Sequence, residues 1–218
     1  MQNPCKLKVG GQEFQVAELK NNQLIYEFPM ILRFLEYQGK HLFGKKFKLY
    51  EDDYSLIYKL ANYFIRDTKV CEALKIDLKK GILLSGPVGC GKTSLMKLMR
   101  YLVPHRPEYR VIPARNVVFA FNHVGYKIIE DYGDKKSYCF DDLGVEPTGR
   151  YFAADCNVMG ELLISRYELY QETGLITHLT TNLAASELEK RYGDRVRSRM
   201  RELFNLVAFP ENTEDKRK

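Results

Sequence analysis

The segment Gly86–Thr93 constrains the fold of this chain more than any other feature. It reads Gly-Pro-Val-Gly-Cys-Gly-Lys-Thr and matches the pattern G-x-x-x-x-G-K-[ST] in full. An apolar run, Gly81–Ser85, comes directly before it, and residues 95–102 carry apolar side chains at helical spacing after it. A strand, a glycine-rich loop and a helix in this order are typical of α/β folds that bind nucleotide phosphates.

The residue types of this loop suit a triphosphate. Glycines allow backbone N–H groups to turn toward phosphate oxygens, and the N-terminus of the following helix adds the positive end of its dipole. Lys92 supplies a charge for the β- and γ-phosphates, and the Thr93 hydroxyl is a ligand for Mg²⁺. A glycine turn that opens an ordinary helix is the alternative. The residues expected to bind the nucleotide are Gly86, Pro87, Val88, Gly89, Cys90, Gly91, Lys92, Thr93 and Ser94.

Strand-like and helix-like segments alternate from Gly81 onward. Further strands are expected at Arg110–Pro113, Ser137–Asp141, Leu175–Thr181 and Leu206–Phe209. Helices are expected at 117–132, 157–171, 186–192 and 194–204, the last two separated by Gly193. This alternation predicts an α/β fold with a five-stranded parallel sheet covered on both faces, the three-layer sandwich of P-loop NTPases.

The first 75 residues differ from the rest of the chain in their pattern of polar and apolar residues. Lys6–Val16 alternates polar and apolar residues around Gly10-Gly11, which predicts a β-hairpin. Leu24–Tyr37 is apolar and aromatic and is compatible with either a helix or a partner-binding segment. Tyr54–Arg66 has the spacing of an amphipathic helix.

Composition excludes several classes of protein. The chain has 218 residues, 45% of them hydrophobic, and a formal net charge of +6, which permits contact with nucleic acid without requiring it. No apolar run has the length of a membrane-spanning helix, and no secretion signal begins the sequence. The five cysteines and the histidines His105, His123 and His178 lack metal-ligand spacing, so we expect structural histidines, reduced thiols and a cytoplasmic protein.

Two adjacent carboxylates, Asp141 and Asp142, close the third expected strand of the sheet. In P-loop enzymes an acid at this place holds Mg²⁺, and a neighbouring carboxylate polarises the water that attacks the γ-phosphate. We assign Asp141 to the metal and Asp142 to the general base. Two acids at a strand end are otherwise a helix cap or a solvated turn, but the phosphate loop upstream favours the catalytic interpretation.

The fourth expected strand ends in Thr180-Thr181-Asn182. An amide at the end of an apolar strand suits a residue that orients the attacking water beside the γ-phosphate. The alternative is that Asn182 is a turn former, which is common for asparagine at strand ends.

An arginine-rich helix follows at 194–204. The apolar stripe on which we expect it to pack consists of Val196, Met200 and Leu203. We expect Arg195 and Arg199 beside this stripe, with their guanidinium groups held by packing, and Arg197 and Arg201 on the solvent side. A fixed guanidinium suits charge neutralisation at a neighbouring subunit's γ-phosphate, and a basic solvated face is the alternative.

These segments, taken in order, resemble the AAA+ ATPases of the DnaC/IstB type, which are bacterial replicative-helicase loaders and transposition helper ATPases. The resemblance covers about Leu42 to Pro210. The segments that carry it are Gly86–Thr93, Phe140–Glu146, Arg166–Glu168, Thr180–Leu183 and Tyr192–Met200. The Asp-Asp-Leu-Gly, Thr-Thr-Asn and Gly-Asp-Arg-Val-x-Ser-Arg-Met elements are much more specific than the phosphate loop alone.

The resemblance implies a role for each candidate residue. Asp141 and Asp142 match the Walker B pair, Asn182 matches sensor 1, and Arg199 matches the arginine finger, with Arg195 as the second candidate. The resemblance implies that the strand before Asn182 lies between two others in the sheet. One is the strand that precedes the phosphate loop, and the other is the strand that carries Asp141. ATP and Mg²⁺ are the implied ligands. Self-association is also implied, because an arginine finger acting on a neighbouring subunit requires an oligomer.

The resemblance also implies a domain organisation. We expect a partner-binding N-terminal extension over 1–41, an AAA+ ATPase core over 42–210 and a flexible tail over 211–218, without a C-terminal lid domain. A segment around Phe47–Tyr50 is the candidate for the base pocket. Arg115, Lys127 and the pair Lys135-Lys136 are candidate DNA contacts, with ordinary solvated side chains as the alternative.

The expected function is that of an ATP-hydrolysing helicase loader in DNA replication, which binds DNA, expected to be single-stranded, as an oligomer. A transposition helper ATPase of the IstB type has the same chemistry and a transposase as its client in place of a replicative helicase. A nucleotide-gated adaptor that does not hydrolyse ATP is a further alternative, and Asp142 argues against it. A small-molecule P-loop kinase is disfavoured by the Thr-Thr-Asn and Ser-Arg-Met elements.

Overall fold

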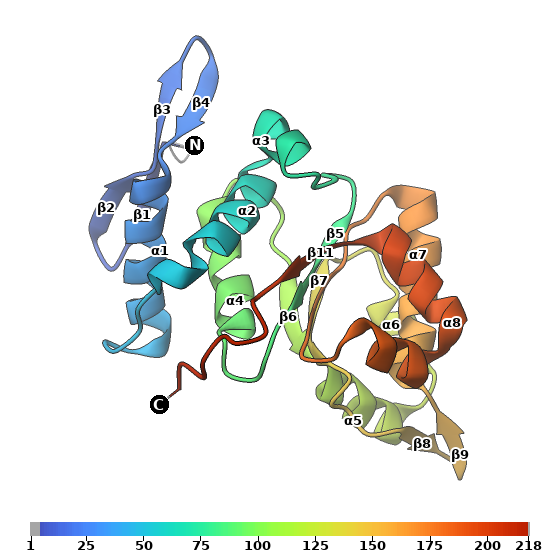
Figure 1. Cartoon of the computed structure of the whole chain (residues 1–218). Helices are drawn as coiled ribbons and strands as arrows, with labels where there is room; N and C mark the ends of the chain where they lie inside the picture. The colour runs from blue at the N-terminus through green and yellow to red at the C-terminus, as the bar shows by residue number, and fades with distance from the viewer. Residues whose placement is uncertain (1–4, 218) are drawn as a thin grey trace. The chain divides into compact units, whose positions relative to one another are not determined.

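A computed structural model describes residues 5–217 of the chain. These residues divide into two compact units. The first comprises residues up to 76 together with residues 94–108, and the second comprises residues 77–93 and the chain from Tyr109 onward. The helices and strands are labelled in Figure 1.

The second unit is built on a five-stranded sheet whose strands run parallel in the order β11-β5-β10-β7-β6. The strands are β5 (Gly81–Ser85), β6 (Arg110–Pro113), β7 (Tyr138–Leu143), β10 (His178–Thr181) and β11 (Phe204–Ala208). Every strand expected from the sequence is present, and β10 lies between β5 and β7 as the resemblance implies. The predicted α/β P-loop fold is therefore confirmed.

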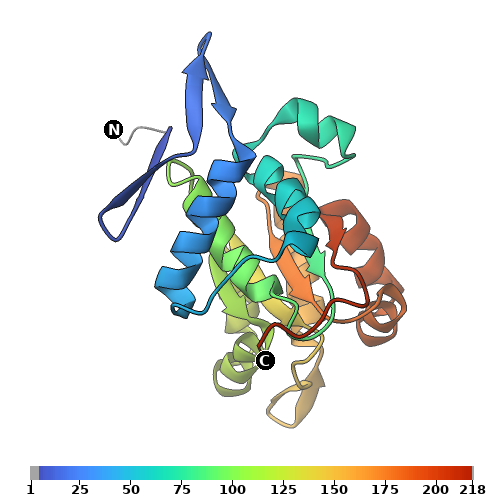
Figure 2. The same cartoon turned by 60° about the vertical axis from the view of Figure 1, so that its left-hand side comes forward.

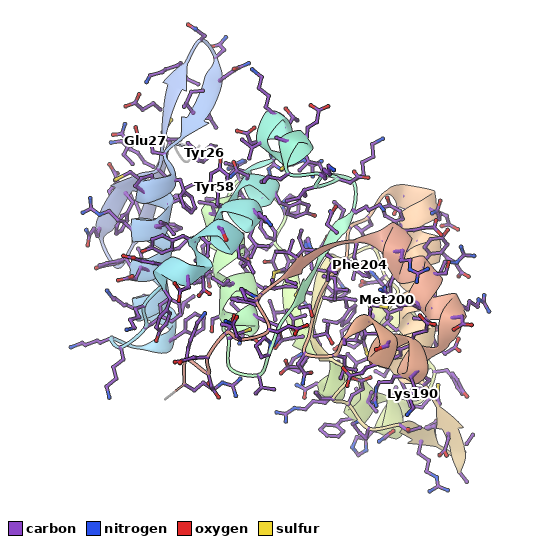
Figure 3. All side chains as sticks on the ribbon, viewed as in Figure 1. Tyr26, Glu27, Tyr58, Lys190, Met200 and Phe204 are labelled. Carbon is purple, nitrogen blue, oxygen red and sulfur yellow. The ribbon has the colours of Figure 1, made fainter. Side chains whose placement is uncertain are left out.

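Four helices complete the core of this unit. They are α5 (Ala114–Val124), α6 (Lys127–Tyr132), α7 (Val158–Thr173) and α8 (Ala185–Leu203). Helix α7 packs against α8, as Figures 1 and 2 show. Met200 on α8 and Phe204 at the start of β11, both labelled in Figure 3, are buried in the same apolar cluster as residues of β7 and β10. The cluster fixes α8 against the sheet through its apolar stripe.

The single helix predicted over 117–132 is wrong. The helix ends at Gly125, which has a φ of +78°. A Cβ at this position would lie 2.5 Å from the ring of Tyr151, so the chain needs both the left-handed backbone and the absent side chain of glycine. The short hairpin that carries Tyr151, formed by β8 (Gly149–Tyr151) and β9 (Ala154–Cys156), was not predicted either.

Helix α8 contains the interruption that the sequence predicts. Gly193 has φ +81° and ψ +164°, which are non-helical, so two helical segments meet at this residue. The second segment, from Asp194, carries the arginines that the sequence analysis singles out.

The first unit contains two antiparallel hairpins. The pair β1 (Lys6–Val9) and β2 (Gln12–Gln15) confirms the predicted hairpin. The second pair, β3 (Ala17–Lys20) and β4 (Gln23–Tyr26), was not predicted. The sequence is compatible with a helix over Leu24–Tyr37, and in the structure a helix begins at Phe28, after β4.

The helices of the first unit follow these hairpins. They are α1 (Phe28–Phe43), the short 3₁₀ helix η1 (Glu51–Asp53), α2 (Tyr54–Ile65) and α3 (Thr68–Ala73). Helix α2 confirms the predicted amphipathic helix, and the rings of Phe28 and Tyr58 lie 5.0 Å apart between α1 and α2; Tyr58 is labelled in Figure 3. Helix α4 (Lys92–Leu102) follows the phosphate loop, and its first two residues belong to the second unit.

The five cysteines all lie among residues 5–217, and none of them forms a disulfide. Among residues 5–217, no helix combines the length and apolar character needed to cross a bilayer.

Candidate functional site

The phosphate loop closes around the side chain of Lys92. This residue begins α4 and is only 5% exposed. Its ammonium group donates hydrogen bonds to the carbonyl oxygens of Gly86, at 2.7 Å, and Pro87, at 2.8 Å. Gly89, in the middle of the loop, has a φ of +81°, a conformation that few residues other than glycine adopt. The phosphate loop therefore holds the Lys92 side chain close to the carboxyl end of β5.

A hydroxyl–carboxylate network joins this loop to the end of β7. The Thr93 hydroxyl lies 2.9 Å from both carboxylate oxygens of Asp141. The hydroxyl of Thr180, on β10, donates to the same carboxylate at 2.6 Å. Three segments that are distant in sequence therefore meet at one buried acid, since Asp141 is only 6% exposed. Thr180 was not assigned a role from the sequence, because its contact depends on the register between β10 and β7.

Asp142 is arranged differently from its neighbour. Its side chain is exposed, and its φ is +55°. Its backbone N–H donates to the Thr180 hydroxyl at 2.9 Å, and the pairing of β7 with β10 shifts register beside it. Such irregularities change the direction of a side chain, and aspartate tolerates the left-handed backbone better than most residues. The two carboxylates therefore face different surroundings, one buried and bonded, the other open.

Asn182 follows β10 directly, at the same edge of the sheet as Thr93 and Asp141. Its Oδ1 atom is buried and accepts no hydrogen bond from the described residues. Buried polar atoms usually have a partner, so an orphaned amide oxygen needs an explanation. A water molecule or a ligand group at this edge would supply the missing donor.

Glu146, in the loop after β7, links the acidic strand end to α8. It is 4% exposed, and its carboxylate accepts a hydrogen bond from the Gly144 N–H at 2.7 Å. The Tyr192 hydroxyl donates to the same carboxylate, and Arg191 donates to the carbonyl oxygen of Glu146. Burial and the charge of Glu146 raise the pKa of Tyr192 well above its usual value. Glu146 was not assigned a role from the sequence, although an acid between Val145 and Pro147 is a detectable signal.

The two candidate finger arginines are not held in the same way. Arg199 donates to the Tyr167 hydroxyl at 3.3 Å and to Glu202 at 3.2 Å, and its guanidinium lies 4.4 Å from the centre of the Tyr167 ring. Arg195 is exposed. Packing therefore orients Arg199, as the sequence predicts. The same prediction is wrong for Arg195, which lies about 100° around the helix from Val196 and is exposed.

The predicted position of Arg197 is wrong. Its Nε atom is buried and has no hydrogen-bond partner in the described chain, whereas Arg201 is exposed as expected. Arg197 directly follows the buried Val196, so it lies about 100° around the helix from that residue, on the flank of the apolar stripe and not opposite it.

The other candidate residues have varied surroundings. Ser94 is the third residue of α4, and Phe47–Tyr50 lies in the first unit, where the Leu49 N–H donates to Glu36 at 3.3 Å.

Of the candidate DNA contacts, Arg115 and Lys135 are exposed. Lys127 pairs with Glu130 and Asp131, and Lys136 pairs with Asp134. These pairs leave less positive charge for a phosphate backbone.

The donor set at Thr93 and Asp141 fits Mg²⁺. A hydroxyl and a carboxylate are hard oxygen ligands, and this ion commonly keeps several waters and binds one or two carboxylates together with substrate phosphates. The described residues contain no group of three or more His, Cys, Asp or Glu side chains arranged for a metal. An ion at this site would therefore depend on the phosphates for part of its coordination.

The fold has relatives among solved structures. A putative primosome component from Streptococcus pyogenes serotype M3 is 17% identical, with a TM-score of 0.56 over 76% of this chain and 83% of that chain. DnaI is 18% identical, with a TM-score of 0.54 over 76% of this chain and 89% of that chain. AMPPCP-bound DnaA from Aquifex aeolicus is 21% identical, with a TM-score of 0.50 over 76% of this chain and 48% of that chain. A scan with protein-family models gives no match, and neither does a search of curated proteins. The likeness shows that this chain shares its fold with these proteins.

Proposed function

We propose that this protein binds and hydrolyses ATP and acts in DNA replication as a helicase loader of the DnaC type. The observation that carries the proposal is the network in which Asp141 accepts hydrogen bonds from both Thr93 and Thr180 beside the phosphate loop. An ordinary glycine turn has no reason to bury a carboxylate at this point, because removing a carboxylate from water is costly. An anion-binding loop next to a cation-binding acid is the arrangement that a triphosphate with Mg²⁺ requires.

The loop residues have separate tasks in this mechanism. The N–H groups of the loop and the N-terminus of α4 bind phosphate oxygens. The Lys92 ammonium exchanges its bonds to the Gly86 and Pro87 carbonyls for the phosphates as ATP enters. Mg²⁺ held by Thr93 and, through water, by Asp141 would neutralise charge on the phosphates.

Hydrolysis requires a water molecule that is both oriented and activated. The exposed Asp142 carboxylate accepts the proton of this water, and the unpaired Oδ1 atom of Asn182 accepts its second hydrogen bond. Thr180 fixes the backbone of Asp142 and the carboxylate of Asp141 through one hydroxyl. The two acids can thus perform different functions although they are adjacent in sequence.

The arginines of α8 complete the ATP-hydrolysing site of a neighbouring copy of the chain. Arg199 is held on the surface of its own subunit by Tyr167 and Glu202, which presents its guanidinium outward. Such a group supplies charge to the γ-phosphate of the next subunit and makes hydrolysis depend on assembly. Arg195 is the second candidate for this role.

The structural relatives support the replication context. They are a putative primosome component, DnaI and DnaA, and each matches this chain over 76% of its length. We therefore expect the client to be a replicative helicase, and the DNA to be single-stranded.

The test combines binding, turnover and client identity. Purified protein should bind a fluorescent ATP analogue, and phosphate release should increase when poly-dT oligonucleotide is added. Affinity capture from the source cell should then recover a hexameric helicase. Capture of a transposase would support the helper-ATPase alternative, tight ATP binding without phosphate release would support the adaptor, and absence of nucleotide binding would refute the proposal.

A further inference from the structure

The segment that follows β11 contacts the outer side of the phosphate loop. Residues 211–217 were expected to form a solvated tail, yet the backbone N–H of Lys216 donates to the Gly89 carbonyl at 3.1 Å. The ammonium group of the same residue donates to the Cys90 carbonyl at 2.9 Å. Both contacts lie within the second unit.

Several further contacts hold Lys216 in this position. The Phe209 N–H donates to the Ser85 carbonyl at 2.9 Å, which continues the pairing of β11 with β5 by one residue. A turn then reverses the chain, since both the N–H and the hydroxyl of Thr213 donate to the Pro210 carbonyl. The Lys216 ammonium lies 5.0 Å from the centre of the buried Phe209 ring, within the range of a cation–π contact.

The loop is closely fitted to this segment. A Cβ on Gly89 would lie 2.0 Å from the carboxylate of Asp215, so the glycine permits the approach as well as the left-handed backbone. The Arg217 N–H donates to the same carboxylate at 2.9 Å, which fixes the chain on the far side of Lys216.

The two carbonyls that Lys216 binds belong to peptide units whose N–H groups are those of Cys90 and Gly91. In a planar trans peptide the C=O and N–H bonds point in opposite directions. The Cys90 N–H donates to the Pro87 carbonyl at 3.5 Å. The Cys90 carbonyl, held toward the Lys216 ammonium, turns the Gly91 N–H toward the other side of the loop, where phosphates would bind. An ammonium group on the oxygen also polarises the peptide and strengthens its N–H as a donor.

Together, the two lysines hold most of the loop's carbonyls. Lys92 binds those of Gly86 and Pro87, and Lys216 binds those of Gly89 and Cys90. The difference is that Lys92 must exchange its bonds for phosphates, whereas Lys216 acts from the opposite side and can keep its bonds.

We propose that Lys216 is a positioning residue for nucleotide binding, which holds the Cys90–Gly91 peptide with its N–H group directed at the phosphates. This inference rests on the proposed nucleotide binding. It assigns to the segment after β11 a part in the site that the sequence analysis did not foresee.

The test compares Lys216→Met with Lys216→Arg and with Arg217→Met. The methionine variant should bind ATP about tenfold more weakly, because a charge-assisted hydrogen bond to the loop is lost, while kcat at saturating ATP stays within about twofold of wild type. The arginine variant should recover most of the affinity. Arg217→Met is the matched control, since it removes the same charge from an exposed neighbour, and it should bind as wild type does.

Two further measurements separate positioning from a general loss of structure. The amide resonance of Gly91 should shift in Lys216→Met without nucleotide, and the melting temperature should stay close to that of wild type. Unchanged affinity in Lys216→Met, tighter binding, or a fall in kcat equal to the fall in affinity would each overturn the inference and leave the proposed function intact. Failure of wild type to bind nucleotide would overturn both.

Discussion

The two ends of strand β10 both bury polar groups, but in different ways. At its amino end, the buried His178 accepts a hydrogen bond at Nδ1 from the Ile82 N–H at 3.0 Å. Beside it, the fully buried Arg166 donates to Thr177 at 2.8 Å and to the Asp134 carbonyl at 2.7 Å. The partners of Arg166 are neutral acceptors and the partner of His178 is a backbone N–H donor, and these bonds join the amino end of β10 to neighbouring segments.

The carboxyl end of the same strand concentrates acids and leaves an oxygen unpaired. Thr180 connects the buried Asp141 to the backbone of the exposed Asp142, and the Oδ1 atom of Asn182 is buried without a donor in the described chain. Ligands of open α/β sheets bind beyond the carboxyl ends of the strands. At the amino end the Nη2 atom of Arg166 is also buried without a partner in the described chain. The comparison therefore teaches that neither buried polarity nor an unmet donor alone marks a site, whereas a buried acid together with an unmet acceptor at this edge does.

If the comparison is correct, the largest effect comes from the lysine at the carboxyl end. Lys92→Ala should reduce ATP affinity at least about a hundredfold, because it removes the charge that faces the phosphates. Isothermal titration measures the affinity. Lys97→Ala, on the same helix, is the control for loss of one positive charge. Retained affinity in a folded Lys92→Ala protein would contradict the phosphate-loop assignment.

The next largest effect separates the two adjacent acids. Asp142→Asn should keep ATP affinity and lower phosphate release about a thousandfold, as expected when a general base is removed. Asparagine is the suitable replacement, since it also tolerates the positive φ of this position. Asp155→Asn, an exposed acid on β9, is the control. Turnover that survives in Asp142→Asn would place the base at another residue.

A smaller effect tests whether the site is completed by a second copy. Arg199→Ala and Lys92→Ala should each be inactive alone, since one lacks the arginine and the other lacks bound ATP. Random mixing should restore activity to about a quarter of the wild-type level, because a head-to-tail contact then pairs an intact ATP site with an intact arginine in about one of four interfaces.

Arg201→Ala, which changes an exposed arginine two residues along α8, should be active without mixing. Activity that stays absent in the mixture, although both proteins still assemble, would remove Arg199 from this role and leave Arg195 to be tested.

The strands of the sheet could be predicted because each is a short apolar run bounded by polar or turn residues, and this pattern is local. The phosphate loop and the pair Asp141-Asp142 could be predicted because their patterns are also local in the sequence. Thr180 could not, because its hydroxyl reaches Asp141 only through the register of β10 against β7. The break at Gly125 depends on the ring of Tyr151, 26 positions later, and is likewise invisible in the local pattern.

The hairpins β3–β4 and β8–β9 were missed for a different reason. Their strands have only four and three residues each, and β3, β8 and β9 show no alternation of exposed and buried positions. In the site, the contact of Lys216 with the phosphate loop was missed because nothing in a polar, charged segment indicates which carbonyls it will bind.

The smallest effect concerns the amino end of β10. Burial lowers the pKa of His178 to about 3, from an ordinary value of 6.5, so the folded protein keeps this residue neutral. A lowered pKa contributes stability that is fully present above pH 6.5 and is lost as the pH falls toward 3. The free energy of unfolding should therefore decrease by about 2 kcal/mol between pH 7 and pH 5 from this residue alone.

Denaturant unfolding of His178→Asn at several pH values measures this contribution. Asparagine can accept the Ile82 N–H bond without titrating, so the variant should lose this decrease of about 2 kcal/mol in unfolding free energy between pH 7 and pH 5. Its ATP affinity at pH 7.5 should remain that of wild type. His123→Asn, at an exposed position on α5, should keep the wild-type pH dependence of the unfolding free energy. If His178→Asn unfolds with the same pH dependence as wild type, or if it loses ATP binding while folded, the two ends of β10 are not functionally distinct, and the division between structural and ligand-binding polarity fails.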